Sequence, residues 1–468
     1  MEQPLDPFMS ALAVAESVRS GASSARAVAE AALARIDEVD GGLNAFTVVL
    51  ADRALAQATE VDSRLASGES LPLAGVPLAV KDHVWLAGAP ATNGSRALAD
   101  FVPEADCVAV SRLTRAGAVV VGKTNNPEFC YRGDTDSPLW GLTRNPWNRD
   151  RTPGGSSGGS GVAVATGMAA LAIGTDGGGS IRIPAAFCGI VGHKPSHGLV
   201  PTQPGFRGWP TLSVHGPMGR SVPDVAAMLE VMAGAHPQDP STVPLPLVAH
   251  AAATGGREDL RGLRVAVSAD FGYALLEPEV ERAFETAVTT FAALGCELVA
   301  AHPKTEDPVP LWMTIAHAEG FASEGPLLAR EDLIEPGTAV TVRRGEAISS
   351  REYLDAQDRR KELSRVWAEF LEGFDFILSP GQQLLPFLVG QDDPSDPGGD
   401  ADPNARWWGM DAIANLTGQP VTAVPWDLVE PGLPVGVQLM ARRFADAQLL
   451  AAAGIWEAHG RRLWAHPA

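Results

Sequence analysis

Residues 153–180 read PGGSSGGSGVAVATGMAALAIGTDGGGS, so two Gly/Ser runs enclose a short apolar stretch. The stretch predicts a few helical turns over residues 162–170 and a strand over residues 171–173 that enters the second run. This return of the chain would bring Ser156 near Ser180. Three consecutive glycines precede Ser180, and their backbone N–H groups can converge on whatever that serine attacks. The pattern indicates a nucleophilic serine beside an oxyanion hole.

Helix-like and strand-like segments alternate along the rest of the chain, which favours an α/β architecture with a largely covered sheet. An apolar strand over residues 78–80 leads directly into Lys81, which therefore stands at a strand end. No internal repeat or stiff linker interrupts the pattern, so we expect one compact domain over residues 1–468. Further helices are expected over residues 24–39, 106–116 (capped by Asp106), 278–294 and 444–459, and further strands over residues 118–121, 264–268 and 297–300.

Composition and charge restrict the class of protein. The chain has 468 residues, of which 45% are hydrophobic and 20% charged, so it can bury a large core. Its 56 acidic and 36 basic residues give a formal charge of −20, which argues against nucleic acid or an anionic membrane as the main partner. The N-terminus lacks a signal-peptide pattern, and no run of about 18 apolar residues occurs. We expect a cytoplasmic protein.

Cysteine usage and one acidic stretch add two further expectations. The cysteines Cys107, Cys130, Cys188 and Cys296 form no CxxC pair, so neither a disulfide framework nor a zinc site is indicated, and we expect no metal and no cofactor. Residues 392–404, DDPSDPGGDADPN, predict a loop. A solvated surface loop is favoured over a lid.

Three other interpretations of the Gly/Ser runs fit less well. A flexible linker is disfavoured because the apolar segment IRIPAAFCG, residues 181–189, follows the second run. Neither run ends in the Gly-Lys-Ser/Thr of a nucleotide-binding loop. No Gly-x-Ser-x-Gly elbow with Asp and His in hydrolase order occurs, and we expect structural roles for the histidines. What remains is a serine activated by a lysine.

Further motifs accompany the two runs along nearly the whole chain. They are GVPLAVKD (75–82), VGKTN (121–125), NPWN (145–148), GIVGHKP (189–195), LTGQP (416–420) and GLPVGVQL (432–439). By these motifs the sequence resembles the amidase signature family, whose fold is one large α/β domain with a central mixed β-sheet covered by helices on both faces. The 75 residues from Lys81 to Ser156 and the 24 from Ser156 to Ser180 agree with the family's spacing.

The resemblance implies a role for each residue of the site. Ser180 is the nucleophile, Ser156 is the bridging serine preceded by a cis peptide, and Lys81 is the base. A neutral lysine amine can accept the serine proton through the Ser156 hydroxyl, so burial has to lower its pKa from about 10.4. The remaining implied residues are the oxyanion donors Gly177, Gly178 and Gly179, with the amide of Ser180, and the supporting residues Ser157, Asp176 and Arg182.

The same resemblance implies an amidase that hydrolyses a small-molecule amide through an acyl-enzyme on Ser180, with aryl amides, carbamates and esters as further possible substrates. The signature core is expected over residues 75–200 and the variable region of the substrate pocket over residues 240–410. We expect a monomer or a homodimer.

The substrate pocket is less well defined by the sequence. Cys130 lies in the segment where the family places a pocket wall, although a small buried hydrophobe is the alternative role for this thiol. Ser137 stands where the family usually has asparagine. A neutral or aromatic substrate group is favoured over a charged one, because aromatic side chains are available in the variable regions. They are Trp209, Trp312, Trp407 and Trp408.

Two other functions stay open at this point. One is the glutaminase component of a glutamyl-tRNA amidotransferase, which works with partner subunits. Against it, Thr92-Asn93-Gly94-Ser95 resembles the pattern of free-standing amidases, and residues 343–355 lack a Gly-Thr-Tyr-Ala-Leu-type pattern. The other is a noncatalytic amide-binding relative, which is disfavoured because the lysine and both serines of the triad are present.

Overall fold

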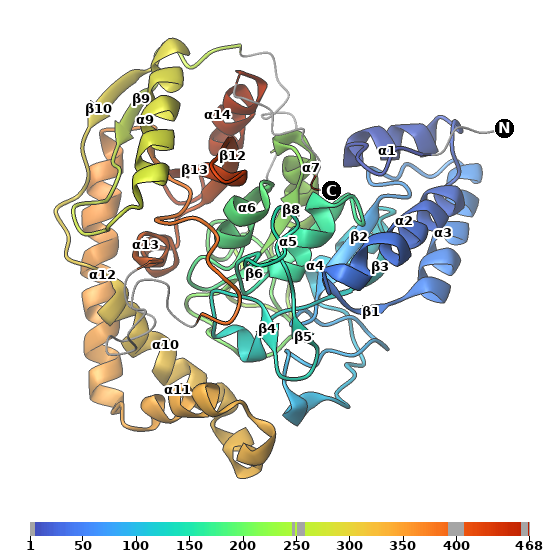
Figure 1. Ribbon diagram of the computed structural model, residues 1–468, viewed down its shortest axis with the longest axis horizontal. Helices are drawn as coiled ribbons and strands as arrows, with labels where there is room; N and C mark the ends of the chain where they lie inside the picture. Colours follow the sequence, from blue (N-terminus) through green and yellow to red (C-terminus); the bar gives the residue numbers. More distant parts are fainter. Residues whose placement is uncertain (1–4, 246–248, 250–257, 392–406, 460–466, 468) are drawn as a thin grey trace.

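The computed structural model describes residues 5–245, 249, 258–391, 407–459 and 467 (Figure 1). Its strands are β1 (Phe46–Val49), β2 (Pro77–Lys81), β3 (Val119–Thr124), β4 (Asp136–Ser137), β5 (Gly141–Leu142), β6 (Leu171–Asp176), β7 (Val191–Lys194), β8 (Val214–Gly219), β9 (Arg264–Val267), β10 (Glu297–Ala300), β11 (Phe376–Pro380), β12 (Val421–Val429) and β13 (Leu433–Ala441).

Its α-helices are α1 (Ala11–Arg19), α2 (Ala25–Val39), α3 (Ala51–Ala66), α4 (Val108–Arg115), α5 (Gly158–Ala165), α6 (Arg182–Cys188), α7 (Val222–Met232), α9 (Pro278–Ala293), α10 (Val309–Glu324), α11 (Pro336–Glu346), α12 (Ser350–Glu372), α13 (Gly409–Thr417) and α14 (Asp446–His459). Short 3₁₀ turns are η1 (Asp40–Gly42), η2 (Arg96–Leu98), η3 (Glu128–Cys130) and η4 (Gly325–Leu333).

A single 11-stranded sheet runs through the molecule in the order β1-β3-β2-β6-β8-β7-β12-β13-β11-β9-β10. Strands β3, β2 and β6 are parallel, β8, β7, β12 and β13 are antiparallel to their neighbours, and β11, β9 and β10 are parallel again. The predicted α/β class with a mixed central sheet is therefore confirmed. The sheet joins the predicted core to the later strands, which agrees with the prediction of one domain over residues 1–468.

The central strands explain why the sheet is covered on both faces. Every residue of β2, β3, β6, β7 and β8 is buried. Because successive side chains of a strand point to opposite faces, both faces of this part of the sheet are shielded from water. Helices α5 and α6 pack against each other and against these strands, while α7 packs on β8 and α14 on β12.

Most predicted elements are present, with two corrections of helix ends. The helix expected over residues 106–116 begins at Val108 with Cys107 as its N-cap, and Asp106 instead accepts a hydrogen bond from the amide of Ala87 at 2.8 Å. The turns expected over residues 162–170 form α5, which begins inside the first Gly/Ser run at Gly158 and ends at Ala165. The loop predicted over residues 392–404 lies outside the described residues.

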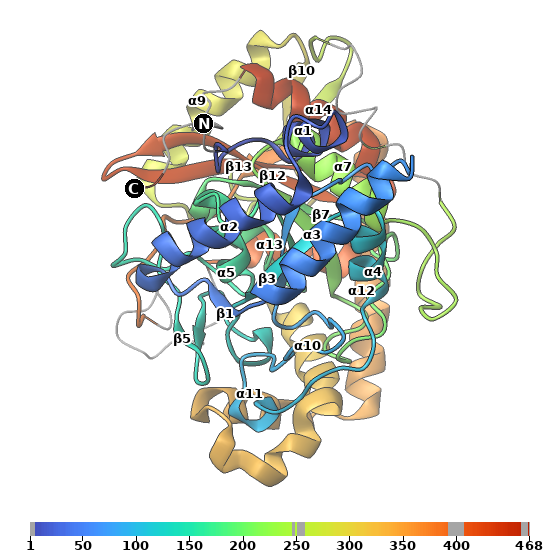
Figure 2. The same cartoon turned by 90° about the vertical axis from the view of Figure 1, so that its right-hand side faces the viewer.

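Helices α10, α11 and α12 contact one another and project from one end of the sheet, as the two views show (Figures 1 and 2). They belong to the region expected to vary with substrate. Within the described part of the chain, no helix is both long enough and apolar enough to cross a membrane.

Packing explains why α5 begins with glycines. A Cβ at Gly159 would lie 2.5 Å from the carbonyl oxygen of Ala45 and the amide nitrogen of Asn125. A Cβ at Gly161, two residues later, would meet the nearest atoms of Cys188 and Pro184 at 3.2 Å. The first glycine therefore touches the backbone of a neighbouring segment, whereas the second has more room.

We expect Gly159→Ala to lower the free energy of unfolding by about 1–3 kcal/mol, because backbone atoms cannot move aside as side chains can. Alanine's helix preference of about 1 kcal/mol over glycine acts in the opposite direction. Gly161→Ala is the matched control and should lose less stability. Chemical denaturation measures both, and equal losses would contradict the packing explanation.

Candidate active site

Two neighbouring parallel strands bring the predicted lysine and the second Gly/Ser run together. Strand β2 ends at Lys81 and β6 ends at Asp176, with Val80 opposite Ile173 in the register. Parallel strands end at the same edge of a sheet, so Lys81 and the loop that follows β6 meet there. The apolar strands on either side bury both.

Lys81 is surrounded by hydroxyl groups. Its Nζ lies 2.7 Å from Ser156 Oγ, 2.8 Å from Thr175 Oγ1 and 3.0 Å from Ser157 Oγ. The side chain is fully buried. Burial lowers the pKa of Lys81, although the nearby Cys130 and Asp176 act in the opposite direction. A buried amine with hydroxyl partners is the environment that a lysine base requires.

The glycines of the first run allow the backbone to pass very close to other segments. The peptide bond between Gly155 and Ser156 is cis, as the family resemblance implies. A Cβ at Gly155 would lie 1.9 Å from the carbonyl oxygen of Asp134, and one at Gly158 would lie 2.3 Å from Thr135 Oγ1. The packing therefore excludes a side chain at either position.

The two Gly/Ser runs touch each other. The amide of Ser157 donates to the carbonyl oxygen of Ser180 at 3.2 Å, and its hydroxyl lies 3.2 Å from the backbone of Thr175. The loop after β6 and the start of α5 are thus joined directly. The expected return of the chain therefore places Ser180 beside the segment that carries Ser156.

The amides of the second run differ in how they are used. Gly179 has a φ of 114° and donates to Asp176 Oδ1 at 2.8 Å. Within the described residues, the amides of Gly177, Gly178 and Ser180 have no protein acceptor. The expectation that Gly179 is an oxyanion donor therefore needs correction, because its hydrogen is already directed to a carboxylate.

A buried ion-pair network holds this loop from below. Arg182 donates to both carboxylate oxygens of Asp176 at 2.9 Å and to Asp411 Oδ1 at 2.8 Å. Its side chain also bonds Asn415 Oδ1 at 2.7 Å, while Asn415 Nδ2 donates to the carbonyl oxygen of Asp176 at 2.9 Å. Burial raises the pKa of Asp176, but the guanidinium of Arg182 outweighs it and holds that pKa well below its usual range.

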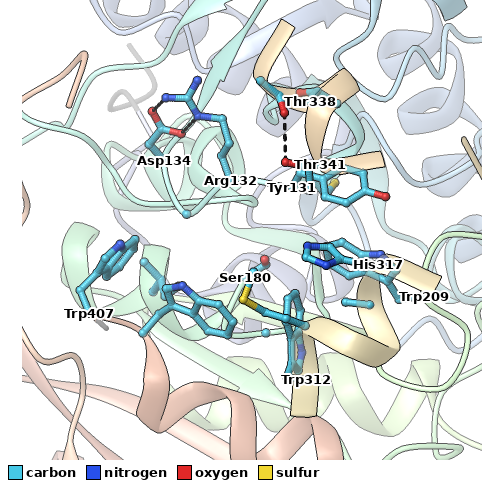
Figure 3. A pocket seen from close by; sticks show the side chains of 18 of the residues that line it. Tyr131, Arg132, Asp134, Ser180, Trp209, Trp312, His317, Thr338, Thr341 and Trp407 are labelled. Carbon is cyan, nitrogen blue, oxygen red and sulfur yellow. Dashed lines mark hydrogen bonds and ion pairs between the residues drawn. The ribbon is translucent and has the colours of Figure 1, made fainter. Parts of the chain in front are cut away.

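A cavity of about 190 Å³ opens in front of Ser180 (Figure 3). A dry cavity of about 150 Å³ holds one benzene molecule, so this one suits a ring-sized group. All four tryptophans named from the sequence line it, together with Cys130. Other lining residues are Tyr131, Arg132, Asp134, Ile183, Met313, His317, Thr338, Thr341 and Phe387.

The wall opposite the tryptophans is polar. Arg132 Nε lies 3.0 Å from Asp134 Oδ1, and this ion pair stands above Ser180 in Figure 3. Tyr131 donates to Glu324 Oε2 at 3.0 Å, and burial raises the pKa of Glu324 to about 7. One side of the cavity is therefore aromatic and the other offers hydrogen-bonding groups.

Cys130 lies between the pocket and the lysine. Its backbone and that of Phe129 have positive φ angles of 63° and 50°. Burial raises the pKa of the Cys130 thiol, but the charges of Lys81 and His83 outweigh burial and lower it to about 6. The thiol is therefore both buried and part of the pocket wall, and it lies close enough to Lys81 to affect the titration of the lysine.

Several residues near the site were not foreseen from the sequence. Thr175 contacts Lys81, Asp411 and Asn415 complete the network of Arg182, and His317 lines the cavity. Thr175 directly precedes the predicted Asp176, which is the one signal that could have pointed to it. Ser137 replaces the family's asparagine by donating to the carbonyl oxygen of Gly94 at 2.9 Å.

Comparison with known proteins agrees with this site. The family model described as Amidase matches residues 27–450. The chain is 35% identical to an acylamidase of Rhodococcus erythropolis, over 96% of this chain and 95% of the relative. It is 36% identical to the glutaminase component of the glutamyl-tRNA(Gln) amidotransferase of Synechococcus sp. (strain WH7803), over 95% of this chain and 96% of the relative.

The structure is also similar to that of a bacterial aryl acylamidase of the amidase signature family. The TM-score is 0.89 at 29% sequence identity, and the match covers 97% of this chain and 96% of that chain. The chain belongs to the amidase signature family across nearly its whole length. It is accordingly a hydrolase acting on carbon–nitrogen bonds.

We expect Arg182→Met to lower the free energy of unfolding by about 3–5 kcal/mol, because it leaves Asp176 and Asp411 as buried carboxylates without their cation. Arg365→Met on the exposed face of α12 removes a surface ion pair with Glu362 and should change stability little. Thermal or chemical unfolding of both variants measures the difference. Similar stability of the two variants would show that the buried network contributes no more than a surface pair.

Proposed function

We propose that the protein hydrolyses a carboxylic amide through an acyl-enzyme on Ser180, with Ser156 as proton relay and Lys81 as base. The observation that carries this proposal is the 2.7 Å contact between Lys81 Nζ and Ser156 Oγ in a fully buried setting. Burial lowers the pKa of Lys81, so a larger share of this amine is neutral near neutral pH. Only the neutral amine can accept a proton.

The proposed relay accounts for each proton. As Ser180 Oγ bonds to the carbonyl carbon, its proton passes to Ser156 Oγ, and the proton of Ser156 passes to Lys81 Nζ. The carbon–nitrogen bond then breaks, and the same relay returns a proton to the leaving nitrogen. Water attacks the resulting ester by the same route, which releases the acid and restores Ser180. Ser157 and Thr175 hold the lysine in position through their hydroxyl groups.

The proposal assigns the oxyanion hole to the amides of Gly177, Gly178 and Ser180. Preorganised N–H donors stabilise the negative charge that develops on the carbonyl oxygen. Close packing supports this assignment, since a Cβ at Gly177 would lie 2.7 Å from the ring of Trp209 and one at Gly178 would lie 3.0 Å from that of Trp312. Gly179, Asp176 and Arg182 instead hold the loop in shape.

The cavity favours a substrate with a neutral or aromatic group. Indole rings cover one wall, and the charged pair on the other wall, Arg132 and Asp134, is internally neutralised. An acylamidase and an aryl acylamidase are among the similar proteins, which supports aryl amides, with carbamates and activated esters open to the same mechanism. The amidotransferase components among the relatives keep glutamine as the alternative substrate.

The purified single chain should release p-nitroaniline from small acyl anilides, and Ser180→Ala should lower kcat by a factor on the order of 10⁴ or more, because the nucleophile is lost. Lys81→Met and Ser156→Ala test the relay in the same assay. Glutamine deamination is measured in parallel.

Ser111→Ala, a change outside the site, is the control for handling and should keep wild-type turnover. Anilide turnover that survives Ser180→Ala would contradict the proposed nucleophile. Turnover of glutamine alone, or activity only after partner subunits are added, would indicate the amidotransferase function instead.

The pH profile should report Lys81. As pH rises through the lowered pKa of Lys81, the amine becomes neutral, so kcat/KM should rise from acid toward mildly alkaline pH. Cys130→Ala removes a group that raises the pKa of Lys81, and the acid limb should therefore move to lower pH. Initial rates from pH 5 to 9 measure both effects.

Cys188→Ala is the matched control, because this buried thiol donates to the carbonyl oxygen of Pro153 and is not among the groups that shift the pKa of Lys81. Its acid limb should coincide with that of the wild type. A flat wild-type profile would contradict the role of Lys81 as base, and an unshifted Cys130→Ala profile would show that the thiol does not act on the lysine.

A further inference from the structure

One tryptophan of the pocket wall also holds the loop of the second Gly/Ser run. Trp312, in the first turn of α10, donates from its indole Nε1 to the carbonyl oxygen of Gly177 at 2.7 Å. Its side chain is nearly buried, and Figure 3 shows it rising from its helix beside Ser180. A side chain from the region outside residues 75–200 thus reaches into the loop that precedes Ser180.

This hydrogen bond sets the orientation of a whole peptide unit. The peptide between Gly177 and Gly178 is not among the cis bonds of the chain, and a trans peptide is planar with its C=O and N–H pointing in opposite directions. Fixing the oxygen of Gly177 therefore fixes the direction of the Gly178 amide hydrogen. Glycine backbones are unusually free to rotate, so a run of three glycines needs such an external hold.

The other parts of the loop have their own anchors. Asn415 holds the carbonyl oxygen of Asp176, Asp176 holds the amide of Gly179, and Ser157 holds the carbonyl oxygen of Ser180. Among the described residues, Trp312 is the one side chain that hydrogen-bonds to the peptide between Gly177 and Gly178.

Neighbouring rings fix the indole of Trp312 in turn. Trp209 packs edge-on against it with ring centroids 5.3 Å apart, and Trp408 packs edge-on with centroids 4.8 Å apart. The ring of Trp209 also lies against Gly177, where a Cβ would be 2.7 Å away. The aromatic wall and the loop therefore form one packed unit.

We propose that Trp312 is a positioning residue for amide hydrolysis, whose indole N–H orients the Gly178 amide toward the developing oxyanion. This inference rests on the proposed function, which assigns Gly178 as an oxyanion donor. Donors of this kind act through being held in place before the reaction, so a donor that can rotate stabilises the transition state less. The ground state is affected little, because the substrate carbonyl carries little charge.

The test replaces the indole N–H and keeps the ring. Incorporation of β-(3-benzothienyl)alanine at position 312 exchanges the N–H for sulfur in a ring of nearly the same shape, and Trp312→Phe is the genetically simple counterpart. Loss of a complete oxyanion donor costs about 10²–10³-fold in kcat, so a donor that is present but loosely held should cost about 10- to 100-fold. KM and the midpoint of the pH profile should stay near wild-type values.

A second readout reports the oxyanion site directly. An arylboronic acid forms a negatively charged tetrahedral adduct on a serine, so its inhibition constant should weaken in parallel with kcat in both variants, while inhibition by the product acid should not change. Trp407→Phe, which lines the far side of the same pocket and contacts Gly133, is the control. It should alter KM and leave kcat and boronate affinity relative to substrate nearly unchanged.

The outcomes separate this inference from the proposed function. Wild-type kcat in the benzothienyl variant, a loss confined to KM, or an equal kcat loss in Trp407→Phe would each overturn the role of Trp312, provided that turnover still depends on Ser180. Activity that survives Ser180→Ala would overturn the proposed function and this inference together. A kcat loss shared by both position-312 variants, with matching loss of boronate affinity, would support it.

Discussion

The removal of the Lys81 amine from water is the physical constraint on which the rest of the site depends. A lysine in water holds its proton at neutral pH, since its pKa is about 10.4. Here the amine is fully buried at the end of β2 and has three hydroxyl oxygens within 3.0 Å, so the charged form loses its hydration without gaining a directly bonded carboxylate. The surrounding sheet therefore has a chemical purpose, because only strands buried on both faces can carry a lysine into such an environment.

The second constraint is the shape of the loop before Ser180, which charges hold in place. Glycine allows the close contacts that the loop makes, but it gives the loop no preferred conformation. Asp176 and Arg182 supply that conformation, and they do so in a buried setting where an unpaired charge is costly. The pair is completed by Asp411 and Asn415 from α13, so the loop keeps its shape only when a helix from more than 200 residues later has packed against it.

What the sequence could predict follows from how local each cause is. The central strands, the helix over residues 24–39 and the β9–α9–β10 unit follow from short-range hydrophobic patterns, and the site residues stand in motifs of a few residues. Asp411 was not foreseen because it is an ordinary helical residue until the fold places it beside Arg182. Asp106 and Gly179 show the converse. A local rule gave each a role, as helix cap and as oxyanion donor, but tertiary contacts with Ala87 and Asp176 use their hydrogen-bonding groups instead.

The same reasoning explains why the substrate is harder to read than the reaction. The chemistry depends on Lys81, Ser156 and Ser180, whose surroundings come from the predicted core. The cavity wall comes from η3, α10, α11 and the segment before α13, which meet only in the folded chain. Trp312 belongs to both parts, since it covers the substrate and bonds Gly177. A change in this wall that suits a new substrate therefore has to leave that indole where it is, which limits how far the pocket can vary without a loss in the rate of the chemical step.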